Sequence, residues 1–67
     1  MVTGVIESFD EHRGDGVLRS DEGQLFYFHC VAIADGTRSI PVGVRAAGER
    51  SVGRLGRDEL ANVAAFT

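Results

Sequence analysis

Tyr27 and His29 carry rings that could stack on a flat ligand. They lie in the segment Gln24–Cys30 (QLFYFHC), which is rich in aromatic residues and predicts a strand. Because side chains alternate along a strand, Tyr27 and His29 should share one face, with Phe26 and Phe28 on the other. We place the phenylalanines in the core, since they carry no polar atom. The outward pair either stacks on a ligand or only stabilises the sheet across strands, and both interpretations remain open.

Arg13 is followed by Gly14, Asp15 and Gly16. Glycines beside a cation can bring a phosphate close to backbone N–H groups. The same pattern is typical of an ordinary tight turn with a solvated arginine. The carboxylate of Asp15 between the two glycines favours the ordinary turn.

Side chains that could hold a metal ion or catalyse a reaction are few. Asp10, Glu11 and His12 are consecutive, and adjacent residues in a turn rarely converge on one ion. His29 and Cys30 are neighbours on a predicted strand and should point to opposite faces, so no thiol–imidazole pair is expected. No phosphate-binding loop motif occurs. We therefore expect no metal, no cofactor and no enzymatic activity.

The elements that must position these residues are five short strands. Alternating and β-branched residues predict them at residues 2–9, 17–19, 24–30, 44–50 and 59–66. Asp21, Glu22 and Gly23 are a hairpin signal, residues 31–33 predict a helical turn, and residues 34–39 and 52–56 predict loops. The alanines of residues 59–66 also suit a helix, which stays open as an alternative. This spacing predicts an all-β fold, a small five-stranded antiparallel barrel.

Length and composition agree with one small domain spanning residues 1–67. Of the 67 residues, 43% are hydrophobic and 25% are charged, which is too apolar for a disordered chain. Cys30 is the only cysteine, so no intrachain disulfide can form and a reducing compartment is expected. No apolar run approaches the ~20 residues of a membrane span, and no secretion signal is visible. We expect a cytoplasmic protein without a membrane partner.

Charge is distributed unevenly along the chain. Seven of the ten acidic residues lie in residues 1–36, whereas five of the seven arginines lie in residues 37–67, and the net charge is −3. Proteins that depend on phosphate contacts usually show a basic patch. The arginines at 45, 50, 54 and 57 either form such a stripe or are a solvated surface. The asymmetry also allows head-to-tail self-association.

The order of these motifs resembles the bacterial cold-shock domain family over nearly the whole chain. Residues 1–10 resemble the family's opening strand, and residues 13–18 (RGDGVL) stand where its first ribonucleoprotein motif is expected. Residues 26–29 (FYFH) stand where the second is expected, and Asn62 and Val63 resemble its closing pair. The resemblance implies an OB-fold barrel. Its core positions would be Ile6, Leu18, Phe26, Phe28, Ile33 and Val63.

Two of these core residues differ in size from what the family usually has. Phe26 and Phe28 are larger than the usual valines, whereas Ala46 and Gly48 on the fourth strand are smaller than usual. Because interiors keep their total volume, we expect the two exchanges to compensate.

Cold-shock proteins bind single-stranded RNA or DNA by stacking bases on an aromatic platform. The resemblance carries this role to the residues of this chain that keep a ring or a cation there: Phe9, Arg13, Tyr27, His29 and Arg38. Other positions where the family has a ring hold different residues here: Ser8, Asp15, Val17, Cys30 and Thr37. Glu7 and Asp15 also add negative charge to that face.

The sequence therefore predicts weak, salt-dependent binding of single-stranded RNA or DNA, as an RNA chaperone or expression regulator in stress. The alternative is a protein-interaction module that kept the barrel and lost nucleic-acid binding.

Overall fold

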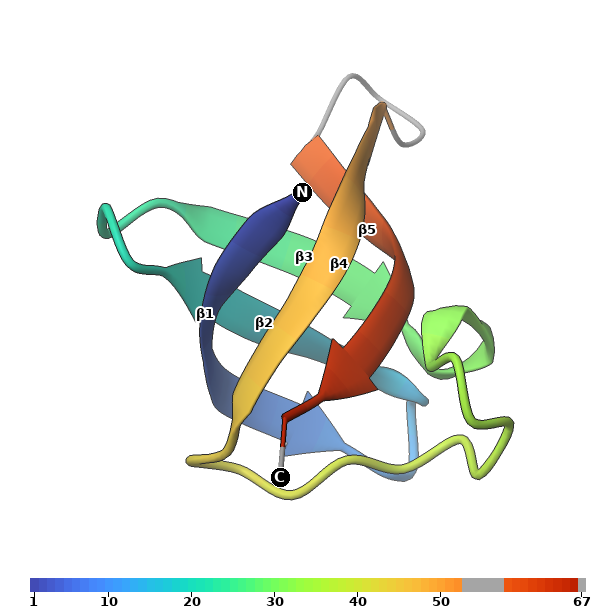
Figure 1. Ribbon diagram of the computed structural model, residues 1–67. Helices are drawn as coiled ribbons and strands as arrows, with labels where there is room; N and C mark the ends of the chain where they lie inside the picture. Colours follow the sequence, from blue (N-terminus) through green and yellow to red (C-terminus); the bar gives the residue numbers. More distant parts are fainter. Residues whose placement is uncertain (53–57, 67) are drawn as a thin grey trace.

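The computed structural model describes residues 1–52 and 58–66 (Figure 1). Its elements are β1 (Val2–Asp10), β2 (Asp15–Ser20), β3 (Leu25–His29), the short 3₁₀-helix η1 (Cys30–Ala32), β4 (Arg45–Val52) and β5 (Asp58–Ala65). The strands pair in the order β1-β2-β3-β5-β4 and close into a barrel. The predicted all-β, five-stranded barrel of the OB type is thus confirmed, and residues 59–65 form a strand rather than a helix.

The barrel closes through one parallel pair of strands. All other strand pairs are antiparallel, but β3 and β5 run parallel and have a single register pair, Tyr27 with Glu59. An isolated parallel bridge between Ile33 and Val63 continues the contact. A parallel pair needs a crossover connection, which here runs through η1, the following loop and β4. The seam between β3 and β5 therefore brings together residues that are far apart in the chain.

A tight turn joins β2 to β3 at the predicted hairpin. Gly23 has a φ of 92°, a left-handed conformation that glycine adopts without strain. Its N–H donates to the carbonyl oxygen of Ser20 at 2.8 Å, and the Ser20 hydroxyl accepts from the N–H of Gln24 at 3.0 Å. The buried Ser20 side chain is satisfied in this way.

A β-bulge in β1 changes which side chains point outward. The register with β2 shifts between Ile6 and Ser8, so Glu7 is an extra residue on β1. Without the shift, strict alternation would turn Ser8 toward the core beside Ile6. With it, Ser8 is exposed and Phe9 is half-buried.

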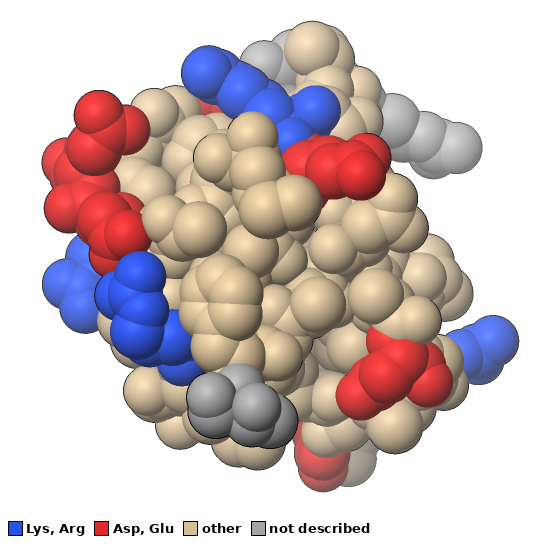
Figure 2. All heavy atoms as spheres, in the orientation of Figure 1, with Lys and Arg blue, Asp and Glu red and all other residues tan. Residues whose placement is uncertain are grey.

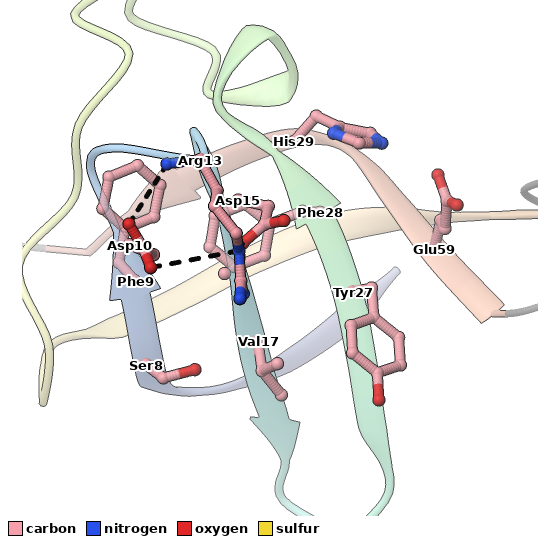
Figure 3. Close-up of a pocket in the computed structure, with 11 residues that line it drawn as sticks. Ser8, Phe9, Asp10, Arg13, Asp15, Val17, Tyr27, Phe28, His29 and Glu59 are labelled. Carbon is pink, nitrogen blue, oxygen red and sulfur yellow. Dashed lines mark hydrogen bonds and ion pairs between the residues drawn. The ribbon is translucent and has the colours of Figure 1, made fainter.

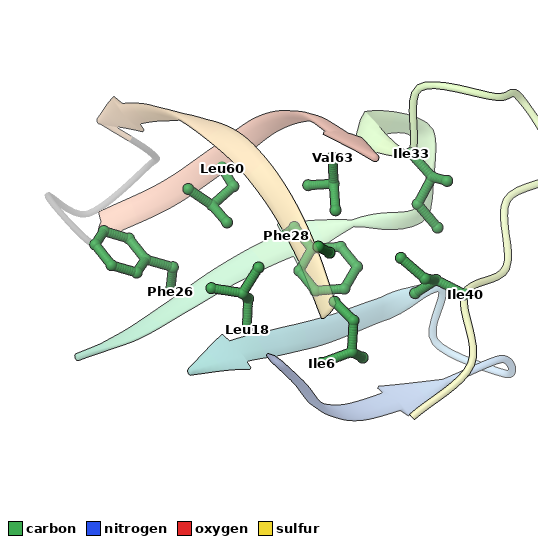
Figure 4. Close-up of a cluster of buried hydrophobic side chains, with 9 residues drawn as sticks. Ile6, Leu18, Phe26, Phe28, Ile33, Ile40, Leu60 and Val63 are labelled. Atoms are coloured by element: carbon green, nitrogen blue, oxygen red, sulfur yellow. The ribbon is translucent and has the colours of Figure 1, made fainter. Parts of the chain in front are cut away.

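The core contains every residue expected there from the sequence (Figure 4): Ile6, Leu18, Phe26, Phe28, Ile33 and Val63 are all buried. Ile40 and Leu60 complete it, although the sequence analysis did not include them. A Cβ atom added at Gly48 would lie 3.2 Å from the Leu60 side chain, so Leu60 packs directly against this small residue. Ala46 and Ala47 are also buried, at 0% and 5% exposure, which shows that β4 crosses the core closely.

The helical turn expected at residues 31–33 is present as η1. Val52, expected in a loop, ends β4, and residues 53–56 of that expected loop lie outside the described residues. Within the described part of the chain, no helix has the length and apolar character needed to cross a membrane.

Asp21 ties the β2–β3 turn to β1 and β4. Its carboxylate accepts hydrogen bonds from both terminal nitrogens of Arg45, each at 3.0 Å, and from the Thr3 hydroxyl at 2.9 Å. The hydrogen bond from Arg45, followed by that from Thr3, lowers the pKa of Asp21 below its ordinary value. At a pH above the pKa that Asp21 has in the unfolded chain, its ionised carboxylate stabilises the fold. This contribution disappears as the pH falls through the lower pKa of Asp21 in the folded protein.

We predict that the Phe26→Val variant loses roughly 1–3 kcal/mol of unfolding free energy, because most of a buried ring is removed. Urea denaturation measures this loss. Leu25→Ala is the matched control, since the Leu25 side chain on the same strand is 46% exposed. If the Phe26→Val protein were as stable as the unmodified one, the ring of Phe26 would not be needed to fill the core.

We predict that Asp21→Asn lowers the melting temperature at pH 7, and that the gap to the unmodified protein narrows as the pH falls below about 4. Thermal unfolding followed between pH 7 and pH 2.5 tests this. Glu22→Gln is the control, because Glu22 is exposed on the same turn. A gap that stays constant at all pH values would contradict a stabilising role for the ionised carboxylate.

Candidate nucleic-acid interface

A hollow of about 500 Å³ lies on the outer surface of β1, β2 and β3 and reaches the start of β5 (Figure 3). It is lined by Ser8, Phe9, Asp10, Arg13, Asp15, Gly16, Val17, Tyr27, Phe28, His29 and Glu59. Four of the five residues proposed from the sequence line it, namely Phe9, Arg13, Tyr27 and His29. The fold therefore brings together side chains from β1, the β1–β2 turn and β3.

Two stacked phenylalanine rings form the floor of the hollow. The rings of Phe9 and Phe28 lie 6.1 Å apart between centroids and are inclined by 15°. Gly16 makes this packing possible, because a Cβ there would lie 2.6 Å from the Ser8 carbonyl oxygen and 2.8 Å from the Phe28 ring. Since Phe28 belongs to the core, the position of Phe9 is set by the core.

Tyr27 and His29 stand on the outer face of β3, as expected. Tyr27 is 43% exposed and His29 is exposed. Their partners across to β2 are Val17 and Asp15. The two side chains thus share one side of the hollow and are exposed there.

The turn between β1 and β2 is held by Asp10. One oxygen of its carboxylate accepts from the N–H groups of His12 and Arg13, at 2.9 and 3.1 Å. Gly14, with a φ of 72°, donates its N–H to the Asp10 carbonyl oxygen at 2.8 Å. Because that N–H is already used within the turn, this is an ordinary tight turn, and Gly14 does not present its N–H to a phosphate.

Arg13 is paired with acidic side chains inside the hollow. Its Nη2 and Nε donate to one oxygen of Asp15, at 2.9 and 3.2 Å, and Nε lies 3.9 Å from the Asp10 carboxylate. The hydrogen bond to Asp15 and the nearby negative charges raise the pKa of Arg13. Arg13, the one arginine among the described residues that line the hollow, is therefore partly neutralised before any ligand arrives.

Carboxylates outnumber cations in the hollow. Among the described residues, Asp10, Asp15 and Glu59 line it, against Arg13 alone. Glu59 was not foreseen from the sequence, because only the parallel pairing of β3 with β5 brings it beside Tyr27. Glu7, expected on this face, does not line the hollow, since it occupies the bulge of β1 and pairs with Arg19 at 3.4 Å.

Arg38 is the candidate residue that the fold does not bring to the hollow. It lies in the loop between η1 and β4, exposed, with a φ of 60°. Thr37 in the same loop bonds to Asp35 and to the Ser39 carbonyl oxygen, and neither Thr37 nor Cys30 lines the hollow. Three of the positions that lack the family's rings do line it: Ser8, Asp15 and Val17.

The arginines that the sequence leaves open as a basic stripe or a solvated surface are paired where the structure describes them. Arg45 lies 3.0 Å from Asp21 and Arg50 lies 3.3 Å from Asp58, whereas Arg54 and Arg57 lie outside the described residues. Figure 2 shows acidic and basic side chains beside one another around the rim of one face, with an uncharged area between them. The described arginines therefore form no basic patch on this face.

Within residues 1–52 and 58–66, no group of three or more His, Cys, Asp or Glu side chains is arranged to hold a metal ion. Asp10, in the acidic run beside His12, uses its carboxylate to hold the turn.

No protein-family model matches the chain, and no curated protein sequence matches it significantly. The resemblance to the cold-shock domain rests on the residues quoted above and stays a prediction.

Proposed function

We propose that this protein is a cold-shock-like, non-enzymatic protein of the cytoplasm that binds single-stranded RNA or DNA through the hollow on β1–β3. The observation that carries the proposal is the convergence of Phe9, Tyr27 and His29, from two strands, on one open hollow. Accessible rings on a small barrel suit stacking of unpaired bases, which present a flat face whatever their sequence. By analogy with the family, such binding would melt RNA structure or tune expression during stress.

The magnitudes favour weak binding. Each stacked base contributes about 1–3 kcal/mol, and this hollow offers few rings. Its carboxylates repel phosphates, and Arg13 must leave Asp15 to meet one. Binding therefore depends mainly on stacking of a few bases, and the part contributed by contact of Arg13 with a phosphate weakens as salt is added.

A second candidate function is a protein-interaction module. It is favoured by the excess of carboxylates in the hollow and by the pairing of Arg13 with Asp15. Such a surface suits a basic partner segment, including one from a second copy of this chain.

We predict that fluorescent single-stranded oligonucleotides of RNA and DNA bind saturably at low salt and less tightly at physiological salt. Tyr27→Ala or His29→Ala should weaken binding by about 5- to 150-fold, because each removes one stacking ring. Fluorescence anisotropy measures the affinities. Leu25→Ala is the control, since this exposed residue of β3 does not line the hollow.

No binding of the unmodified protein at low salt would overturn the proposal. A protein partner whose binding is lost in a hollow variant would then support the second function.

We predict that Asp15→Asn binds oligonucleotides several-fold more tightly than the unmodified protein and with a steeper salt dependence. The reason is that Arg13 loses its hydrogen-bonded carboxylate partner and becomes available to a phosphate. Anisotropy titrations at three salt concentrations test this, with Glu22→Gln as a control that removes one negative charge elsewhere. Weaker binding by Asp15→Asn would show that Asp15 itself contacts the nucleic acid.

A further inference from the structure

Glu59 occupies a distinctive place beside the exposed rings. It lies opposite Tyr27 in the single register pair of β3 and β5, and it lines the hollow with Tyr27 and His29. Figure 3 shows Glu59 on β5, on the same side of β3 as the side chains of Tyr27 and His29. The half-buried Glu59 is therefore within reach of the edge of a base that stacks there.

The carboxylate of Glu59 also differs from the other two in the hollow. Asp10 accepts from two backbone N–H groups, and Asp15 accepts from Arg13. Among residues 1–52 and 58–66, no hydrogen bond or ion pair holds the Glu59 side chain. As far as the described residues are concerned, its two oxygens therefore meet no donor and can accept from a ligand.

An ionised carboxylate accepts hydrogen bonds and donates none. It repels a phosphate, but it can accept from the N–H groups on a base edge. Guanine has two neighbouring donors, N1–H and the N2 amino group, on its Watson–Crick edge. These match the two carboxylate oxygens in the same way as the fork of an arginine does.

The other bases fit the carboxylate less well. Adenine and cytosine place one amino group beside a ring nitrogen that is itself an acceptor. Uracil and thymine place one N–H between two carbonyl oxygens, which a carboxylate repels. The preferred order is therefore guanine first and uracil or thymine last.

We infer that the hollow selects an unpaired guanine, stacked on Tyr27 or His29 with its Watson–Crick edge on the Glu59 carboxylate. This inference rests on the proposed function and names the base that the site reads. It also explains how an acidic hollow serves a nucleic acid, because the carboxylate faces a base edge rather than a phosphate. A guanine in a duplex is rejected, since its Watson–Crick edge is occupied.

The test uses labelled oligothymidines of one length with guanine, inosine or thymine at the central position. Inosine keeps N1–H and lacks the N2 amino group. The expected affinities fall in the order guanine, inosine, thymine, with guanine ahead of thymine by roughly 5- to 150-fold. Unlabelled guanosine monophosphate as a competitor distinguishes a free nucleotide from a strand, and it should compete much less well than the guanine-containing strand.

Glu59→Gln should abolish the preference for guanine without weakening binding of the all-thymine strand, because it removes a negative charge and one of the two acceptors. Glu59→Asp keeps the charge and shortens the side chain, and it should reduce the preference without changing phosphate repulsion. Glu49→Gln, at an exposed position of β4, is the matched control, and it should keep the preference.

The outcomes separate the two proposals. Equal affinity for the three central bases overturns the selection of guanine and leaves single-strand binding in place. Absence of binding to every strand overturns the proposed function itself. Competition by guanosine monophosphate as strong as that by the guanine-containing strand would show that the hollow binds guanine as a free nucleotide, and it would overturn a nucleic acid as the ligand.

Discussion

The alternation of side chains along β3 links the core of the barrel to the hollow on its surface. Phe26 and Phe28 point inward and are buried, while Tyr27 and His29 point outward from the same strand. Phe28 also supports the ring of Phe9. Because protein interiors are close-packed, a change in the core volume under β3 moves the rings of the hollow as well. Stability and the geometry of the candidate site are therefore set by one short strand.

The sequence predicts most of this arrangement because its strongest signals are local. The aromatic run of β3 and the hairpin glycine depend on neighbours in the chain, and both are found as expected. The sequence does not predict Ile40 in the core, because it lies in a loop, where no periodicity marks a buried residue. The bulge at Glu7 and the position of Glu59 follow from strand register and from the parallel seam, which are properties of the assembled barrel. Local pattern thus identifies the elements, whereas the composition of the hollow depends on long-range pairing.

Pairing between charged side chains offsets the uneven distribution of charge along the sequence. Arg13, Arg19, Arg45 and Arg50 each lie against an acidic side chain. Such exposed pairs contribute only about 0–1 kcal/mol each to stability, so their main effect is on the electric field outside the barrel. Within the described residues the arginines therefore attract phosphates less than their number suggests. Recognition then depends on the rings and on the acceptors beside them.

The parallel seam has a consequence for the chain as it emerges from the ribosome. β1, β2 and β3 are adjacent in sequence and can pair as soon as they are released, but β5 completes the barrel only after β4 has followed. Until then the inner face of this three-stranded sheet, with Phe26 and Phe28, has no cover. Exposed apolar sheet surface of this kind is what chaperones recognise and what promotes aggregation. The inner face is thus uncovered from the emergence of Phe28 until Leu60 has also left the ribosome and β5 has paired, and slow pairing of β5 prolongs the exposure.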